Sequence, residues 1–178
     1  VDPAADRQPT WFPDGTAIAY TSDRDGTDAI WRLPVFGGTP TMVIADAAQP
    51  AISPDGTRVA FVRVNPAGLT RIAVAPLDAP EDVRVLTDDD DGRWAHESPA
   101  WSPDGRTLSY NDHRNLWLVP AEGGVARRIT ADELGDHAAR WLGSGRGLVV
   151  TSLLREGVVA LWAVAGDGRG ASRRLTAV

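Results

Sequence analysis

The fold is decided by a short segment, Pro99-Ala100-Trp101-Ser102-Pro103-Asp104-Gly105, because the same pattern returns along the chain. Two earlier copies read Pro9-Thr10-Trp11-Phe12-Pro13-Asp14-Gly15 and Pro50-Ala51-Ile52-Ser53-Pro54-Asp55-Gly56. A degraded copy reads Ala139-Arg140-Trp141-Leu142-Gly143-Ser144-Gly145. Subtracting residue numbers places the anchors Trp11, Ile52, Trp101 and Trp141 at intervals of 41, 49 and 40 residues. A period of about 40 residues is typical of solenoids and propellers, so the chain consists of four tandem repeats.

Each repeat contains four segments of strand length. The first carries the anchor and ends at the Pro-Asp-Gly turn, in which Pro presets φ and Gly takes a positive φ. In the first repeat the others are Ala17 to Ser22, Ala29 to Leu33 and Met42 to Ile44. Short strands in groups of four, without helical periodicity, predict an all-β fold, a β-propeller of four-stranded antiparallel blades. We expect one domain over residues 1–178, with blades at about 8–46, 47–87, 88–130 and 131–176.

The second segment of each repeat indicates how the blades pack. Ile18 and Tyr20 share one face of their strand, and the smaller Ala19 lies on the other. Later repeats alternate in the same way, which lets the large face of one blade interlock with the small face of its neighbour. We therefore expect the tryptophans at repeated positions to pack in the core, namely Trp11, Trp31, Trp101, Trp117, Trp141 and Trp162.

Further motifs recur in phase with the anchors. They are Ser22-Asp23-Arg24-Asp25-Gly26, Ile30-Trp31 with Leu116-Trp117, Glu122-Gly123-Gly124, and the pairs Leu86-Thr87, Ile129-Thr130 and Leu175-Thr176. Together they closely resemble the TolB-like, WD-like bacterial β-propeller repeat. The second repeat departs by carrying Ile52 and Ile72 where the pattern has Trp, and the fourth loses Pro and Asp from its turn. The resemblance implies a periplasmic or extracellular module, and it specifies fold better than function.

Composition narrows the function. The formal net charge is -6 and there is no basic stripe, which argues against a nucleic-acid partner. The chain has no cysteine and no apolar run of membrane-spanning length, so we expect no thiolate metal site and no membrane insertion. It also lacks the Gly-x-Ser-x-Gly and His-Glu-x-x-His motifs, so we predict no catalytic residue, no cofactor and no metal site. Asp23-x-Asp25-Gly26-x-Asp28 offers oxygen ligands for calcium but is equally explained as a polar hairpin.

Up-and-down blades place their connections on two opposite faces. The longer, more variable ones join the second strand to the third and one repeat to the next; they share one face, called here the loop face. The connection over residues 88–98 stands out, because it accounts for the longer interval and holds a run of aspartates beside a Trp. Adjacent carboxylates repel and gain from a basic partner, and a Trp suits a contact anchor. The alternative is a solvated acidic loop. The candidate partner-binding residues on this face are Asp88, Asp89, Asp90, Asp91, Arg93, Trp94, His96, Glu97, His113 and His137.

These observations favour a non-enzymatic module that binds a protein or peptide, or senses a ligand, through the acidic loop face. Two alternatives stay open: the accessory propeller of a prolyl-oligopeptidase-like or tricorn-like peptidase whose catalytic domain is absent from this chain, and a structural spacer. Related propellers usually have more blades, so three arrangements stay open: a closed four-bladed ring, half of an eight-bladed ring completed by a second copy, or a fragment of a larger propeller. The last two predict apolar end faces, with Ile18 and Tyr20 at one end and Val149 or its neighbours at the other. Such faces favour association of two copies through their end blades, which would form a homodimer.

Overall fold

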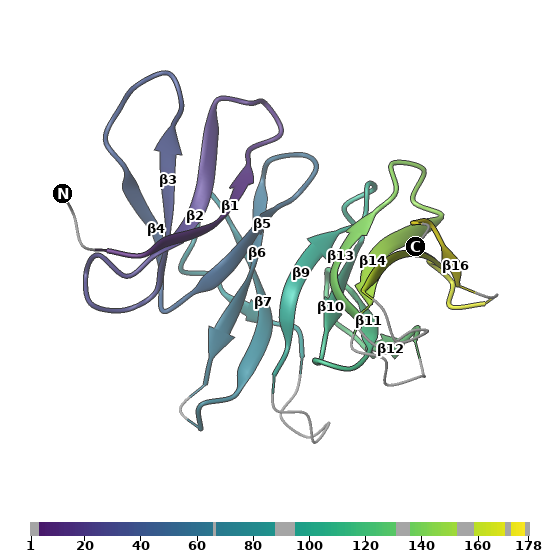
Figure 1. Cartoon of the computed structure of the whole chain (residues 1–178). Helices are drawn as coiled ribbons and strands as arrows, with labels where there is room; N and C mark the ends of the chain where they lie inside the picture. The colour runs from purple at the N-terminus through teal and green to yellow at the C-terminus, as the bar shows by residue number, and fades with distance from the viewer. Residues whose placement is uncertain are drawn as a thin grey trace.

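The computed structural model describes residues 4–65, 67–87, 95–130, 136–152, 159–169 and 172–176. In these ranges sixteen strands form four antiparallel sheets, which follow one another in chain order (Figure 1). The predicted all-β propeller of four-stranded blades is thereby confirmed. Blade 1 contains β1 (Asp6–Trp11), β2 (Ala17–Ser22), β3 (Ala29–Pro34) and β4 (Thr41–Ala45); blade 2 contains β5 (Ala48–Ile52), β6 (Arg58–Val64), β7 (Thr70–Pro76) and β8 (Arg84–Val85); blade 3 contains β9 (Glu97–Trp101), β10 (Thr107–Asn111), β11 (Leu116–Pro120) and β12 (Arg127–Arg128); blade 4 contains β13 (Asp136–Trp141), β14 (Gly147–Ser152), β15 (Ala160–Ala165) and β16 (Arg173–Arg174).

The first strands of consecutive blades lie side by side, β1 against β5, β5 against β9 and β9 against β13. Each of these strands carries one residue in the left-handed region, and its pairing with the second strand shifts register there. A left-handed residue at a register shift bends the strand, and the bend recurs once per blade. The four residues are Gln8, Gln49, Ser98 and Ala138, with φ of 55°, 54°, 54° and 49°.

The turn after the first strand explains the Ser-Pro-Asp-Gly motif. In blade 2 the Ser53 hydroxyl donates to Asp55 Oδ1 at 2.6 Å and accepts from the Arg58 amide at 2.9 Å. Asp55 Oδ1 also accepts from the Thr57 amide at 3.1 Å. These bonds, the one from Ser53 first, lower the pKa of Asp55 to about 2. Blade 3 repeats the arrangement with Ser102 and Asp104.

The recurrent Leu-Thr pair extends the fourth strand, which is only two residues long in blades 2 to 4. The threonine hydroxyl accepts a hydrogen bond from a third-strand amide in the same blade. The pairs are Thr87 with the Ile72 amide at 3.0 Å, Thr130 with the Leu116 amide at 2.8 Å, and Thr176 with the Leu161 amide at 3.2 Å. A side chain thus replaces the backbone pairing that a longer strand would provide.

The core lies between blades. Phe61 and Val59 of blade 2 pack with Ala19 and Ala17 of blade 1, and Tyr110 of blade 3 packs in one cluster with residues of blade 2. The predicted interlock of large and small faces is confirmed at these junctions. In the second repeat, the expectation that Ile72 takes the Trp position is wrong. β6 pairs Phe61 with Ala73, so Ala73 occupies the position held by Trp31 and Trp117.

The blade 1 end of the arc differs from the internal junctions. Trp11 is 61% exposed, whereas Trp101 at the same position of blade 3 is 8% exposed. The expectation that Trp11 packs in the core is therefore wrong, because no described blade precedes blade 1. The expectation that Tyr20 is exposed at this end is wrong. Tyr20 is buried, and the Arg24 guanidinium lies 5.5 Å from its ring centroid and donates to Tyr20 Oη at 2.8 Å.

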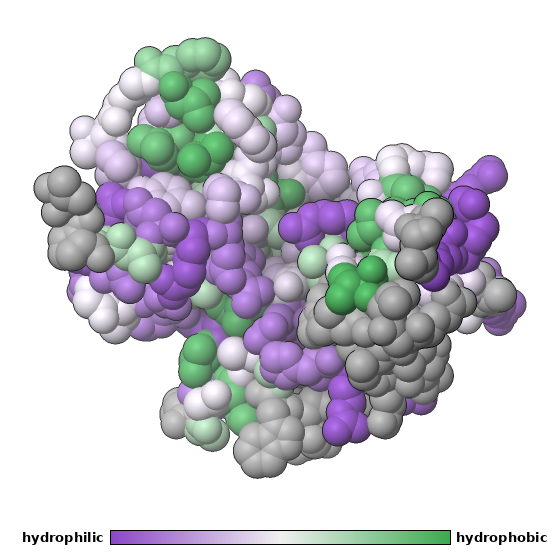
Figure 2. All heavy atoms as spheres, in the orientation of Figure 1, coloured by the Kyte–Doolittle hydropathy of each residue, from purple (hydrophilic) through white to green (hydrophobic). Residues whose placement is uncertain are grey.

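At the other end, Leu161 is 41% exposed, although its counterparts Ile72 and Leu116 are buried by a following blade. Val149 is half-buried. Figure 2 also shows hydrophobic side chains at the tip of blade 1, where Phe36 in the β3–β4 turn is largely exposed, and hydrophilic ones beside the N-terminus. Each end thus exposes one residue that has a buried counterpart inside the arc, Trp11 at one end and Leu161 at the other.

Candidate functional site

The predicted site residues are those expected on the loop face, and most of them lie outside the described residues. This applies to the acidic run and its neighbours, Asp88, Asp89, Asp90, Asp91, Arg93 and Trp94. For His137 only the backbone is described, and it pairs with Thr151 in the β13–β14 ladder. Three predicted residues remain, His96, Glu97 and His113, and the structure separates them into two environments.

Glu97 and His113 come together on the loop face of blade 3. Glu97 begins β9, and His113 lies in the β10–β11 connection with a left-handed φ of 69°. Glu97 Oε1 lies 3.8 Å from His113 Nε2, and the two side chains are 32% and 54% exposed. The pair becomes an ion pair when His113 is protonated. Both side chains are accessible to a partner, so they form the described part of the predicted site.

His96 has a different place. It is fully buried, with its ring centroid 5.0 Å from that of Tyr110 and Nδ1 2.7 Å from Thr87 Oγ1. Its backbone amide donates to Thr70 Oγ1 of blade 2 at 2.8 Å. These contacts tie the connection before β9 to the preceding blade. His96 therefore lies in the blade junction, below the surface on which the sequence placed it.

Two aspartates of the connection between β2 and β3, Asp23 and Asp28, contact the start of the chain. Arg7 contacts Asp28 through Nη2 and lies 3.9 Å from Asp23 Oδ2 through Nη1. Asp23 Oδ1 also accepts from the Ala5 amide at 2.8 Å. The arrangement matches the polar hairpin reading of this segment. Within the described ranges, no three His, Cys, Asp or Glu side chains lie together as metal ligands would.

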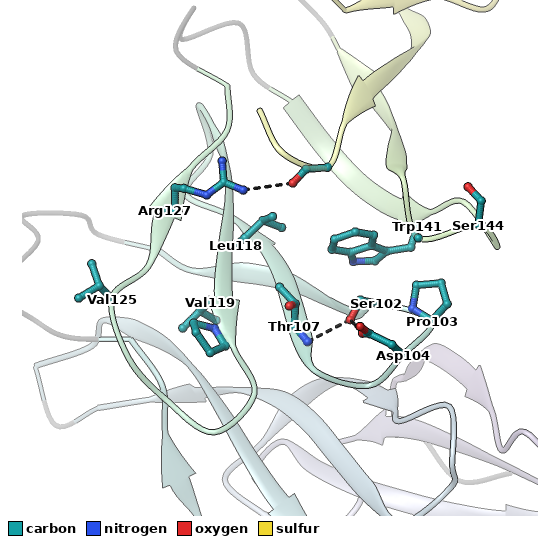
Figure 3. A pocket seen from close by; sticks show the side chains of 13 residues that line it. Ser102, Pro103, Asp104, Thr107, Leu118, Val119, Val125, Arg127, Trp141 and Ser144 are labelled. Atoms are coloured by element: carbon teal, nitrogen blue, oxygen red, sulfur yellow. Dashed lines mark hydrogen bonds between the residues drawn. The ribbon is translucent and has the colours of Figure 1, made fainter. Parts of the chain in front are cut away.

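Three hollows accompany these surfaces. On the loop face, one of about 540 Å³ lies between blades 1 and 2, with Asp28, Asp46 and Asn65 among its lining residues. A second, of about 430 Å³, is lined by first-strand residues of all four blades, including the left-handed Gln49 and Ser98. A third, of about 580 Å³, lies between blades 3 and 4 on the turn face, opposite the loop face, and Figure 3 shows it.

Two features of these hollows were not predicted from the sequence. Gln49 joins three blades: its amide donates to Thr21 Oγ1 at 3.0 Å, and its Oε1 accepts from the Ser98 amide at 2.7 Å. In the sequence, the polar residue that precedes the repeated Pro could have indicated this contact between blades. The third hollow depends on Thr107, which aligns with Arg58 one repeat earlier. That difference in side-chain size is visible in the sequence once the repeats are aligned.

Comparison with known proteins adds the following. A family model described as "TolB beta propeller domain" matches residues 1–111. The "Uncharacterized peptidase YuxL" of Bacillus subtilis is 29% identical over 126 residues, which are 64% of this chain and 18% of that protein. "Tricorn protease homolog 1" of Streptomyces coelicolor is 30% identical over 139 residues, 71% of this chain and 12% of that protein. The chain thus spans less than one fifth of the length of either relative.

Among solved structures, a putative TolB from Agrobacterium tumefaciens superposes with a TM-score of 0.84 and 25% identity. The superposition covers 99% of this chain and 63% of that chain. No helix in the described part of this chain has the length and hydrophobicity that crossing a membrane requires.

Proposed function

Because this chain belongs to the TolB β-propeller domain family, we propose that it is a non-catalytic binding module for a protein or peptide. The observation that carries the proposal is the difference between the blade junctions and the loop face. Repeated hydrophobic residues pack in the blade junctions, while Glu97 and His113 are accessible on the loop face. A rigid scaffold with variable connections on one face is a common design for recognition.

The loop face suits a basic partner. Asp46 lines its hollow between blades 1 and 2 together with Arg63, and the net charge of the chain is -6. We propose that the acidic run Asp88 to Asp91, which follows β8 in the sequence, adds to this charge. Opposite charges across an interface speed association and favour one class of partner. We place the module in the periplasm or outside the cell, following the TolB resemblance.

A lysine-rich peptide titrated into the protein by calorimetry tests this proposal. Neutralising Asp89, Asp90 and Asp91 together with Asn should weaken binding and reduce its dependence on salt. The matched control removes the same charge from the β7–β8 turn on the opposite face, with Asp78→Asn, Glu81→Gln and Asp82→Asn. Equal weakening by both triple variants would mean that net charge, and not the loop face, governs binding.

The names of the relatives favour a second candidate, the accessory propeller of a peptidase. The discriminating observation is the sequence encoded next to this chain. A Gly-x-Ser-x-Gly elbow followed by Asp and His would support the peptidase reading. A membrane anchor with a cytoplasmic signalling domain would support a sensor instead.

The end faces carry a further proposal, contact between blades of two copies of this chain. Trp11 and Leu161 are exposed, whereas Trp101, Ile72 and Leu116 at matching positions of other blades are buried, and a second copy supplies blades of the same kind. Apolar residues of this size at matching junction positions favour burial.

A further inference from the structure

An arginine fills the junction between blades 2 and 3 on the turn face. Arg58 extends from β6, and its guanidinium carbon lies 4.7 Å from the ring centroid of Trp101 in β9. Nη2 donates to the Gly105 carbonyl at 2.8 Å, and Nη1 donates to Glu122 Oε1 at 2.8 Å. One guanidinium therefore contacts an aromatic face, a turn carbonyl and a carboxylate, which is the full set of groups that recognise arginine.

The next junction repeats the aromatic side chain and the turn glycine of this frame without the arginine. Thr107 takes the place of Arg58: each follows the turn by the same interval, and they pair with Pro120 and Pro76 respectively. Trp141 takes the place of Trp101, since its Nε1 donates to the preceding blade at Ala100 O, at 3.2 Å. Because a threonine side chain is too short to lie over the indole, Trp141 is only half-buried and lines the hollow.

In this junction, the space that corresponds to the Arg58 side chain is the hollow of about 580 Å³. Figure 3 shows Trp141 across it from Thr107 and Leu118, with Asp104 at its edge. Gly145, which matches Gly105 in the turn and has the same left-handed backbone, also lines the hollow. The Ser102 hydroxyl, followed by the Arg106 amide, lowers the pKa of Asp104, so the hollow keeps a negative charge at neutral pH.

The hollow also contains a cation of its own, Arg127. Its guanidinium donates to the carbonyls of Asp167 at 2.7 Å and Gly166 at 3.2 Å. At the preceding junction, two cations lie together because one carboxylate binds both. Arg84, at the position of Arg127, donates to Glu122 there, and Arg58 binds the same carboxylate.

We propose that the hollow between blades 3 and 4 binds an arginine side chain of a protein or peptide partner. The partner's guanidinium would take the position that Arg58 occupies one blade earlier, stacked on Trp141 and directed to the Gly145 carbonyl. Arginine suits the site better than lysine, because a planar guanidinium stacks on an indole while donating in its own plane. The site lies on the turn face and is independent of the loop-face proposal.

The probe is N-acetyl-arginine N-methylamide, titrated into the protein while the indole N–H signals are followed by NMR. We expect saturable shifts at Trp141, and binding about tenfold weaker for the citrulline analogue, which keeps the shape but lacks the charge. Equal binding of the citrulline analogue, or no shift at Trp141, would overturn the proposal.

Two variants make the test specific. Thr107→Arg should fill the hollow from within and weaken probe binding about tenfold, as Arg58 does at its own junction. Arg58→Thr should open a second site and add saturable shifts at Trp101. If folded Thr107→Arg protein binds the probe like the wild type, the site is wrong. Should Thr107→Arg fail to fold, the absence of new shifts at Trp101 in Arg58→Thr protein sinks the idea.

Discussion

The indole of Trp101 donates a hydrogen bond to the carbonyl oxygen of Ala51 in the preceding blade, over 2.9 Å. Trp141 makes the same bond to Ala100 at 3.2 Å, so the anchor tryptophan of the repeat joins one blade to the one before it. The repeated Pro-x-Trp pattern therefore encodes contacts between blades as well as strands within them.

We expect Trp101→Ala to lower the free energy of unfolding by about 3–5 kcal/mol, because the side chain is buried and leaves a large cavity. Trp101→Phe keeps much of the packing but loses the bond to Ala51, and should cost at least about 1 kcal/mol. Trp11→Ala is the matched control and should cost less than about 1 kcal/mol, since Trp11 is exposed. Urea denaturation measures all three, and equal costs at Trp11 and Trp101 would contradict the blade alignment.

Acid should destabilise the turn that Asp55 closes. Its pKa is lowered from 3.8 to about 2 in the folded protein, chiefly by the hydrogen bond from Ser53. The stability that the carboxylate contributes is thus present above pH 3.8 and is lost as the pH falls through about 2. Asp55→Asn should be less stable than the wild type at neutral pH, and the difference should shrink on acidification. Asp78→Asn, on the exposed β7–β8 turn, is the control, and an unchanged gap between Asp55→Asn and wild type at pH 2 would contradict the assignment.

Thr87 should matter more than its counterpart in the last blade. Thr87→Val removes the acceptor of the buried Ile72 amide and the contact to His96, which should cost about 2 kcal/mol of unfolding free energy. Thr176→Val removes the matching bond at an exposed site, where water substitutes, and should cost at most about 0.5 kcal/mol. Thermal denaturation of the two variants side by side decides whether burial or the bond itself dominates.

Light scattering tests whether two copies join at their end faces. We expect the apparent mass to rise above 19.0 kDa with concentration, because each copy has uncovered junction residues. Leu161→Glu should return the protein to the monomer mass, since a charge at the junction opposes burial. Val125→Glu, at an exposed position on the β11–β12 turn, should leave association unchanged. A wild type that stays at the monomer mass at every concentration would show that second copies do not cover these faces.

The predicted loop site shows where sequence reasoning stops. Glu97 and His113 lie together on the loop face as expected, because strand order alone places both connections there. His96 is only one residue from Glu97 yet is buried against Tyr110. Alternation along one strand does not tell which neighbour belongs to the surface, since the answer depends on how the adjacent blade approaches.

By itself, the sequence determined the blades of this protein: its period, its strand segments and the position of the Pro-Asp-Gly turn. All of these depend on residues close together in the chain, such as Ser53, Asp55 and Arg58. Only the tertiary structure decided that Trp101 is covered by Arg58, that Trp141 is left open beside Thr107, and that Trp11 is exposed. The physical reason is that burial of a repeated side chain is a property of the junction, so identical residues in successive repeats differ according to the blade beside them.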